Sequence, residues 1–311
     1  MDPYRPITVY LPKEYNGGNQ RFPTLYCLAP WTSAGRNQCD WQPFKESLPD
    51  RMDRLIESGA IPPCIVVCPD LYTMFGGSQY IDSSYLGHHG EHIAKELVPF
   101  IDSQFRTIAD ADSRGVFGRS SGGFGALRLA LDYPGVFSHI ACHSGDMGFD
   151  LVYSDLVSLC NNLRKYRNSV PEFLEYIRQA PKLAGYEVHT LMLIGMAASY
   201  SPNTKSNMGF DLPINLNTGA TIESVWAKWL DNDPVNMVRK NPQPLNDLKT
   251  LYVDCGNRDQ YNLHYGARQL TEVFECKNIH YEYQEFDDNH SGTSYRYDIS
   301  LPLMLSNMGH G

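Results

Sequence analysis

Residues 114–131 read RGVFGRSSGGFGALRLAL and contain the strongest local pattern in the chain. The apolar run before Gly118 is typical of a buried strand, and the run after Gly122 is typical of a helix. Between them, the segment Gly118-Arg119-Ser120-Ser121-Gly122 has the form G-x-S-x-G. A serine on a sharp strand-to-helix turn holds a strained backbone, and small residues two positions away give it room. The stretch therefore predicts a nucleophile elbow with Ser120 as the nucleophile.

Apolar runs on both sides of the elbow predict further strands. The runs before it are ITVYLP (7–12), TLYCLAP (24–30) and CIVVCPD (64–70), and the runs after it are HIACHSGD (139–146), KTLYVDCG (249–256) and HYEYQEF (280–286). Segments with helical spacing separate most of these strands. This alternation predicts an α/β protein with a mostly parallel, doubly wound sheet.

The pattern changes between about residues 150 and 248. Two segments with helical spacing, 151–166 and 170–183, precede loops rich in Asn, Pro and Gly at 199–221, and a further helical segment follows at 224–234. Regular strands then resume. We therefore predict a single domain over residues 1–311, in which residues 150–248 form an inserted helical cap.

The nucleophile requires a base and an acid that orients the base. In chains with this elbow the order is Ser, then Asp or Glu, then His. His290 lies in a polar loop after the last predicted strand, and we assign it as the base. Asp259 lies beyond the carboxyl end of the strand before it, where sites in parallel sheets form. Asp254 falls within that strand, so we choose Asp259 as the acid and keep Asp254 as the alternative.

An oxyanion formed on the substrate needs two backbone N–H donors. Ser121 follows the nucleophile and is placed to supply one of them. The second is expected after the strand at 24–28, within residues 29–32. Pro30 has no N–H group, which leaves Trp31 or Thr32, and we prefer Trp31.

Composition restricts the partners and the compartment. The 311 residues carry a net charge of −9 without a Lys/Arg-rich run, which argues against nucleic acid or an anionic membrane surface as partner. The eight cysteines are scattered, several in apolar runs, as expected for free thiols in a reducing compartment. The first residues show no secretory signal. We expect a cytoplasmic protein with no membrane contact, and a homo-oligomer remains compatible with the sequence.

A histidine-rich segment is a candidate metal site. His88, His89 and His92 lie with Glu91 in the order H-H-G-E-H, which differs from the zinc-binding order H-E-x-x-H. We therefore predict no metal, and the expected chemistry needs no cofactor.

Together these segments resemble the putative-esterase family of α/β hydrolases. That family contains S-formylglutathione hydrolases (esterase D), enterochelin-type siderophore esterases, feruloyl esterases and mycolyltransferases. The resemblance rests on VYLPKEY (9–15), FPTLYCLAPW (22–31), EHIAKELVPFID (91–102), GRSSGGFGALRLALDYP (118–134), VFSHIACHSGD (136–146), DCGNRDQYN (254–262) and the His290 loop. It implies the α/β-hydrolase fold and a triad of Ser120, Asp259 and His290.

Two segments depart from the pattern of this family. Many relatives have His-Gly in the oxyanion loop, where this chain has Ala29-Pro30, and the elbow differs from the GHSMGG form of formylglutathione enzymes. The expected function is a serine carboxylesterase that hydrolyses small or short-acyl esters through an acyl-serine. The alternatives are an acyltransferase, a thioesterase or a peptidase with the same triad, or a non-catalytic binding protein.

Overall fold

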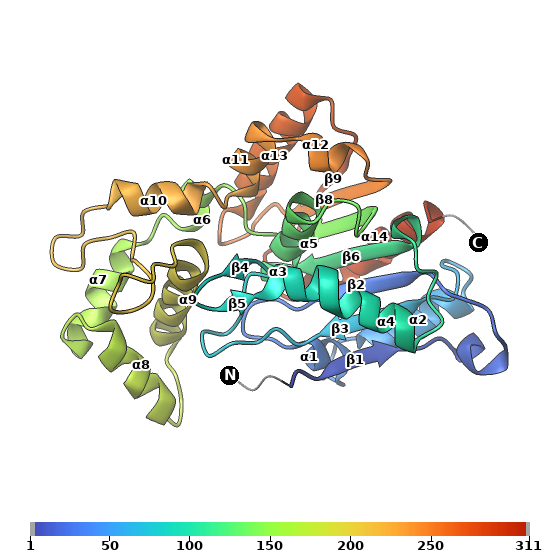
Figure 1. Ribbon diagram of the computed structural model, residues 1–311, viewed down its shortest axis with the longest axis horizontal. Helices are drawn as coiled ribbons and strands as arrows, with labels where there is room; N and C mark the ends of the chain where they lie inside the picture. The colour runs from blue at the N-terminus through green and yellow to red at the C-terminus, as the bar shows by residue number, and fades with distance from the viewer. Residues whose placement is uncertain (1–3, 309–311) are drawn as a thin grey trace.

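The computed structural model of the chain describes residues 4–308 and contains a central seven-stranded sheet (Figure 1). In spatial order the strands are β1 (Ile7–Tyr10), β3 (Ile65–Pro69), β2 (Thr24–Leu28), β6 (Arg114–Arg119), β7 (His139–His143), β8 (Thr250–Gly256) and β9 (Glu282–Phe286). All neighbours pair in parallel except β1, which is antiparallel to β3. Each of the seven predicted strands is present, and the predicted α/β fold class is confirmed.

The strand order reverses between β2 and β6. From β2 the chain continues to β3 on one side, whereas β6, β7, β8 and β9 follow one another toward the other edge. In open α/β sheets, ligands bind outside the carboxyl ends of the strands at such a reversal. The end of β6 carries the predicted elbow, and the end of β2 leads into the predicted oxyanion loop.

Helices cover both faces of the sheet because successive strand residues point to opposite sides. One face packs against α1 (Gly35–Cys39), α2 (Leu48–Glu57) and α14 (Tyr297–Ser306). The other packs against the π-helical segment His92–Leu97, α4 (Val98–Gln104), α5 (Ser121–Asp132), α11 (Pro234–Lys240), α12 (Gln243–Asn246) and α13 (Leu263–Lys277). In β2, for example, Leu25 and Cys27 contribute to the first core, and Tyr26 and Leu28 to the second.

The segment between β7 and β8 is helical and has its own apolar core. It contains α6 (Phe149–Val152), α7 (Val157–Leu163), α8 (Val170–Gln179), α9 (Gly185–Tyr200) and α10 (Glu223–Leu230). Phe173, Ile194 and Trp229 are fully buried in this core, which also includes Phe75 and Phe124 of the sheet region. Figure 1 shows α7, α8 and α10 extending beyond one end of the sheet. Helix α9 was not anticipated from the sequence.

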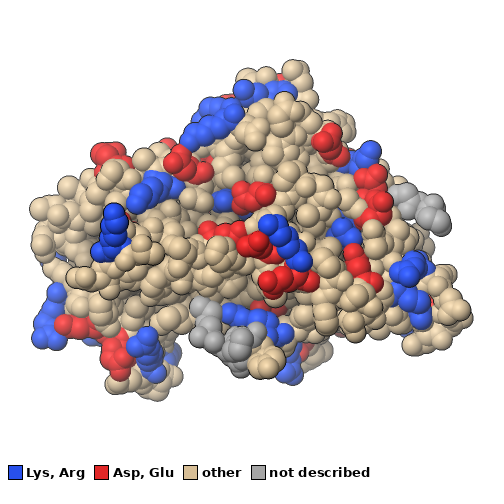
Figure 2. All heavy atoms as spheres, in the orientation of Figure 1, with Lys and Arg blue, Asp and Glu red and all other residues tan. Residues whose placement is uncertain are grey.

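Short elements complete the chain. They are β4 (Asp82–Ser83), β5 (Gly87–His88), α3 (His89–Glu91) and the 3-10 helices Lys13–Gly17, Ala111–Ser113, Arg164–Tyr166 and Thr293–Arg296. Within residues 4–308, no helix combines the length and apolar character that a membrane span requires. On the face seen in Figure 2, acidic and basic side chains lie intermixed.

Candidate active site

Ser120 occupies the tight turn between β6 and α5. Its backbone has φ +57° and ψ −125°, a conformation that few non-glycine residues adopt. The Ser120 N–H donates to the His143 carbonyl over 2.9 Å, which joins the turn to β7. A Cβ on Gly122 would lie 2.1 Å from the Leu28 carbonyl oxygen, and one on Gly118 would lie 2.6 Å from the Gly122 carbonyl carbon. Both glycines are therefore required for the close approach of β2, β6 and α5.

His290 and Asp259 form a buried pair beside this turn. The Nδ1 atom of His290 lies 2.7 Å from Oδ2 of Asp259, and their exposed fractions are 8% and 3%. The Tyr261 N–H donates to Asp259 Oδ1 over 2.8 Å, and Arg119 donates from Nη1 to the His290 carbonyl over 2.9 Å. A carboxylate only accepts, so Nδ1 carries the hydrogen and Nε2 is left as an acceptor.

The alternative acid, Asp254, belongs to a different buried cluster. Its Oδ1 lies 2.8 Å from His143 Nδ1, and its Oδ2 accepts from Arg296 Nε and from the Tyr252 hydroxyl, each over 2.9 Å. Burial alone would raise the pKa of Asp254, but His143 and Arg296 hold it below its ordinary value. The structure therefore brings Asp259, and not Asp254, into contact with His290.

The two candidate oxyanion donors after β2 differ in their partners. The Thr32 N–H donates to the Gly76 carbonyl over 2.8 Å, whereas the Trp31 N–H has no hydrogen bond within the described part of the chain. Ser121 is the first residue of α5, where N–H groups lack a partner inside the helix. The backbone N–H groups of Ser121, which follows β6, and of Trp31, which follows β2, are therefore both available to donate to a bound group.

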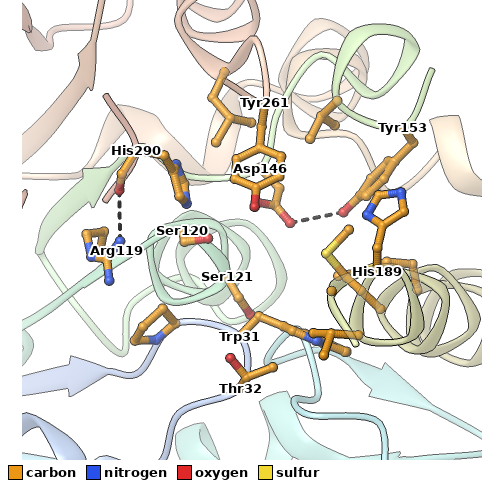
Figure 3. Close-up of a pocket in the computed structure, with 17 residues that line it drawn as sticks. Trp31, Thr32, Arg119, Ser120, Ser121, Asp146, Tyr153, His189, Tyr261 and His290 are labelled. Atoms are coloured by element: carbon orange, nitrogen blue, oxygen red, sulfur yellow. Dashed lines mark hydrogen bonds between the residues drawn. The ribbon is translucent and has the colours of Figure 1, made fainter. Parts of the chain in front are cut away.

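A cavity of about 270 Å³ is lined by five of these residues, namely Ser120, Ser121, His290, Trp31 and Thr32 (Figure 3). Ser120, Ser121 and His290 lie on one side, with Trp31 and Thr32 below them in the view of Figure 3. Its other lining residues are Pro30, Arg119, Asp146, Val152, Tyr153, Gly185, Val188, His189, Met192, Met196, Tyr261 and Leu263. A second cavity, also about 270 Å³, shares Pro30, Trp31, Thr32 and Arg119 with the first and continues toward Arg51.

Several of these lining residues were not predicted from the sequence. His189, Met192 and Met196 project from α9, and Asp146 follows β7. The apolar run LMLIGMAAS (191–199) is the signal in the sequence that is typical of a buried helix. For Asp146 the available signal was its place at the carboxyl end of a predicted strand.

The sequence matches the family described as Putative esterase over residues 1–304. An esterase of Mycobacterium tuberculosis (strain H37Rv) is 35% identical over 142 residues, which are 45% of this chain and 28% of that protein. An endo-1,4-beta-xylanase/feruloyl esterase of Xylanibacter ruminicola is 33% identical over 141 residues, or 44% of this chain and 19% of that protein. The chain thus aligns with under a third of the length of these relatives.

Solved structures share the fold over nearly the whole chain. A ferulic acid esterase superimposes with a TM-score of 0.62 at 19% identity, covering 98% of this chain and 93% of the other. The S-formylglutathione hydrolase of Agrobacterium tumefaciens gives a TM-score of 0.57 at 18% identity, with coverages of 98% and 90%. At these identities the similarity establishes the architecture.

Proposed function

Because the chain belongs to the putative-esterase family, we propose that it is a serine carboxylesterase with Ser120 as nucleophile, His290 as base and Asp259 as the orienting acid. The observation that carries the proposal is the 2.7 Å contact between Asp259 and His290, a residue that lines the same cavity as Ser120. The strained turn at Ser120 supports it, since such strain is concentrated at functional sites.

The proposed reaction proceeds in two steps. His290 Nε2 takes the hydroxyl proton of Ser120 while Oγ forms a bond to the ester carbonyl carbon. The imidazolium then gives that proton to the leaving alcohol oxygen as the C–O bond breaks, and acyl-Ser120 remains. In the second step His290 deprotonates a water that attacks the acyl carbon, and the proton returns to Ser120 as the acid leaves. Asp259 accepts from Nδ1 throughout and stabilises the imidazolium.

The tetrahedral intermediates need two donors at the oxyanion. We propose the backbone N–H groups of Ser121 and Trp31. The engagement of the Thr32 N–H with Gly76 supports Trp31 over Thr32. Because Ser121 opens α5, the partial positive charge of the helix N-terminus adds to the stabilisation.

The cavity supports a small substrate. A volume of about 270 Å³ lies near the lower end for ligand sites and suits a short acyl chain or a single ring. We retain residues 150–248 as the proposed inserted cap, because α9 supplies Val188, His189, Met192 and Met196 to the cavity wall. Within this range, α11 and α12 pack against the sheet. We also retain the proposed cytoplasmic location, which the eight free cysteines support.

Hydrolysis of p-nitrophenyl esters with increasing acyl length tests the function. Wild-type protein and Ser120→Ala are compared side by side, with circular dichroism to establish that the variant folds. We expect activity that declines with chain length and is lost in Ser120→Ala. Equal rates in both proteins would contradict the role of Ser120. Transfer of the acyl group to added alcohol or thiol in preference to water would instead indicate an acyltransferase.

A further inference from the structure

Arg119 directly precedes the proposed nucleophile and is the last residue of β6. Its side chain is half-buried and lines both cavities, the one beside Ser120 and the one that continues toward Arg51. Within residues 4–308, its guanidinium forms no ion pair, and its one hydrogen bond runs from Nη1 to the His290 carbonyl oxygen over 2.9 Å. The described chain thus gives this cation a single directed contact, with the residue proposed as the base.

The nucleophile and the base come from strand ends that lie apart in the sheet. Ser120 follows β6, whereas His290 follows β9, and β7 and β8 lie between these two strands. Neighbouring strands are about 4.8 Å apart, so the loop with His290 has to extend back across roughly 14 Å. Within residues 4–308, His290 contacts Asp259 through Nδ1, and no hydrogen bond joins it to Ser120 Oγ. Another contact therefore has to hold the base beside the nucleophile.

Most contacts of the His290 loop come from the side of β8. Gln260 Oε1 accepts from the His290 N–H over 3.1 Å, and Asp259 Oδ2 lies 2.7 Å from its Nδ1. Both residues follow the end of β8, which is Gly256. Arg119 supplies a hydrogen bond from the other side, at the end of β6. The guanidinium therefore connects the base to the turn that carries the nucleophile.

Figure 3 shows this connection as a dashed line between Arg119 and His290, with Ser120 close to both. A hydrogen bond from a charged donor is stronger than one between neutral groups. The accepting carbonyl belongs to the same residue as the imidazole, so the bond fixes the backbone from which the ring extends. Asp259 sets the tautomer and the orientation of the ring, but it does not determine how far the loop lies from β6.

We propose that Arg119 is a positioning residue that holds His290 at the distance from Ser120 that proton transfer requires. Through the His290 carbonyl it keeps Nε2 within reach of the Ser120 hydroxyl proton, while Asp259 sets the tautomer. Its loss should slow the reaction, because a misplacement of about 1 Å can cost about a hundredfold in rate. This inference rests on the proposed esterase function and adds a residue to its mechanism.

Arg119→Met and Arg119→Lys separate the hydrogen bond from the bulk of the side chain. Met fills similar space without a donor. Lys keeps a charged donor, and a single donor is sufficient because only Nη1 is used. On p-nitrophenyl acetate and butyrate, we expect Arg119→Met to lower kcat by about tenfold or more, by the same factor for both esters, and to leave KM within about twofold. Arg119→Lys should regain most of the lost kcat. A residue that binds substrate would instead change KM.

Added guanidinium provides a second test within one protein. Arg119→Ala leaves space between the two cavities, where a guanidinium ion can donate to the His290 carbonyl. We expect kcat of Arg119→Ala to rise severalfold with guanidinium at concentrations far below those that denature proteins, and not with sodium chloride at the same ionic strength. The comparison is made on a single folded sample, so it does not depend on how the substitution affects folding.

Arg258 is the matched control. Its Nη2 donates to the Asp287 carbonyl over 3.2 Å, so it makes the same kind of contact earlier in the loop that contains His290. Its ion pair with Asp287 is exposed, and such pairs contribute little to stability. Arg258→Met should keep kcat within about twofold of wild type, and guanidinium should not stimulate it. An equal loss of kcat in Arg258→Met and Arg119→Met would contradict a specific role of Arg119.

The outcomes separate the two proposals. If wild-type protein is active, Ser120→Ala is inactive and a folded Arg119→Met keeps the wild-type kcat, the positioning inference is wrong and the esterase function stands. A loss confined to KM, or an Arg119→Ala protein that guanidinium does not stimulate, would have the same meaning. If no ester is hydrolysed and a fluorophosphonate probe does not label the protein, both proposals fail.

Discussion

His290 contacts Asp259 through Nδ1 and Oδ2 at 2.7 Å, although Asp254 lies only five residues earlier in the same segment. Asp254 is the last-but-two residue of β8 and points to His143 and Arg296 instead. The two acids therefore have separate partners. One lies at the candidate active site, and the other links β7 and β8 to Arg296, the last residue of a 3-10 helix.

Asp259→Asn should lower kcat by about three to four orders of magnitude, because an amide does not hold the required His290 tautomer. Its thermal stability should change little by comparison. Steady-state kinetics on a p-nitrophenyl ester together with thermal unfolding measure both effects. A kcat near that of wild type would remove Asp259 from the proposed triad.

Asp254→Asn is the matched control and should act on stability. Removing the carboxylate leaves Arg296 and His143 without their negatively charged partner, at a cost of about 3 kcal/mol in the free energy of unfolding. Because the folded pKa of Asp254 is depressed, its stabilising contribution is present above about pH 4 and is lost as pH falls through the folded pKa. The stability difference between wild type and variant should therefore shrink in acid. Chemical denaturation at pH 7 and pH 3 checks this.

Ser121→Ala removes a hydroxyl but keeps the proposed backbone donor. The substitution breaks the hydrogen bond to Gln79, so we expect a loss of about tenfold or less in kcat/KM. Ser120→Ala, by contrast, should reduce turnover by at least about a thousandfold. If Ser121→Ala were the inactive variant and Ser120→Ala active, the assignment within the elbow would be reversed.

Gly122→Ala should disrupt the elbow. The added methyl would lie 2.1 Å from the Leu28 carbonyl oxygen, so β2 or α5 must move. We expect destabilisation of about 2 kcal/mol or more and a loss of activity. Gly17→Ala is the control, because a Cβ there meets no atom within 4 Å, and it should change stability by less than about 0.5 kcal/mol. Equal melting temperatures for the two variants would contradict the tight packing described for the elbow.

Asp146 should make stability depend on pH in the opposite sense to Asp254. Burial raises its pKa, and the hydrogen bonds from Gln79 and Tyr153 only partly oppose this. The folded state therefore binds the proton more readily than the unfolded state, so the contribution of Asp146 falls as pH rises above its ordinary pKa. The charges of His290 and Asp259 also affect the pKa of Asp146, and both residues are present in the wild type and in the Asp146→Asn variant.

The melting temperature of Asp146→Asn relative to wild type should accordingly be higher at pH 7 than at pH 4, since the amide does not ionise. Differential scanning calorimetry at several pH values measures the difference. A difference that stays constant, or that decreases toward neutral pH, would show that Asp146 ionises in the fold as easily as in water.

Local patterns were sufficient to predict the sheet and the elbow. Strands such as 65–69 are continuously apolar because both faces are covered, and the G-x-S-x-G turn is encoded within five residues. The antiparallel pairing of β1 was not deduced, because it depends on which strand lies at the edge. Helix α9 was missed because it is apolar on nearly all sides and shows no amphipathic period.

The candidate site could be predicted only where chain order restricts it. Ser120, Asp259 and His290 follow a known order along the sequence, so each could be proposed from its position after a strand. Asp146 and Gln79 belong to segments 67 residues apart, and only the folded chain brings them into contact. For the second oxyanion donor the sequence favours Trp31 and leaves Thr32 open, and the hydrogen bond from Thr32 to Gly76, which supports Trp31, arises only in the folded chain.

The most direct test of the central proposal is to locate the covalent adduct of a fluorophosphonate probe by tandem mass spectrometry of the peptide that contains residues 118–128. We predict a single adduct on Ser120, absent in Ser120→Ala and slowed in Asp259→Asn. An adduct on Ser121, or none on a folded wild-type chain, would contradict the account.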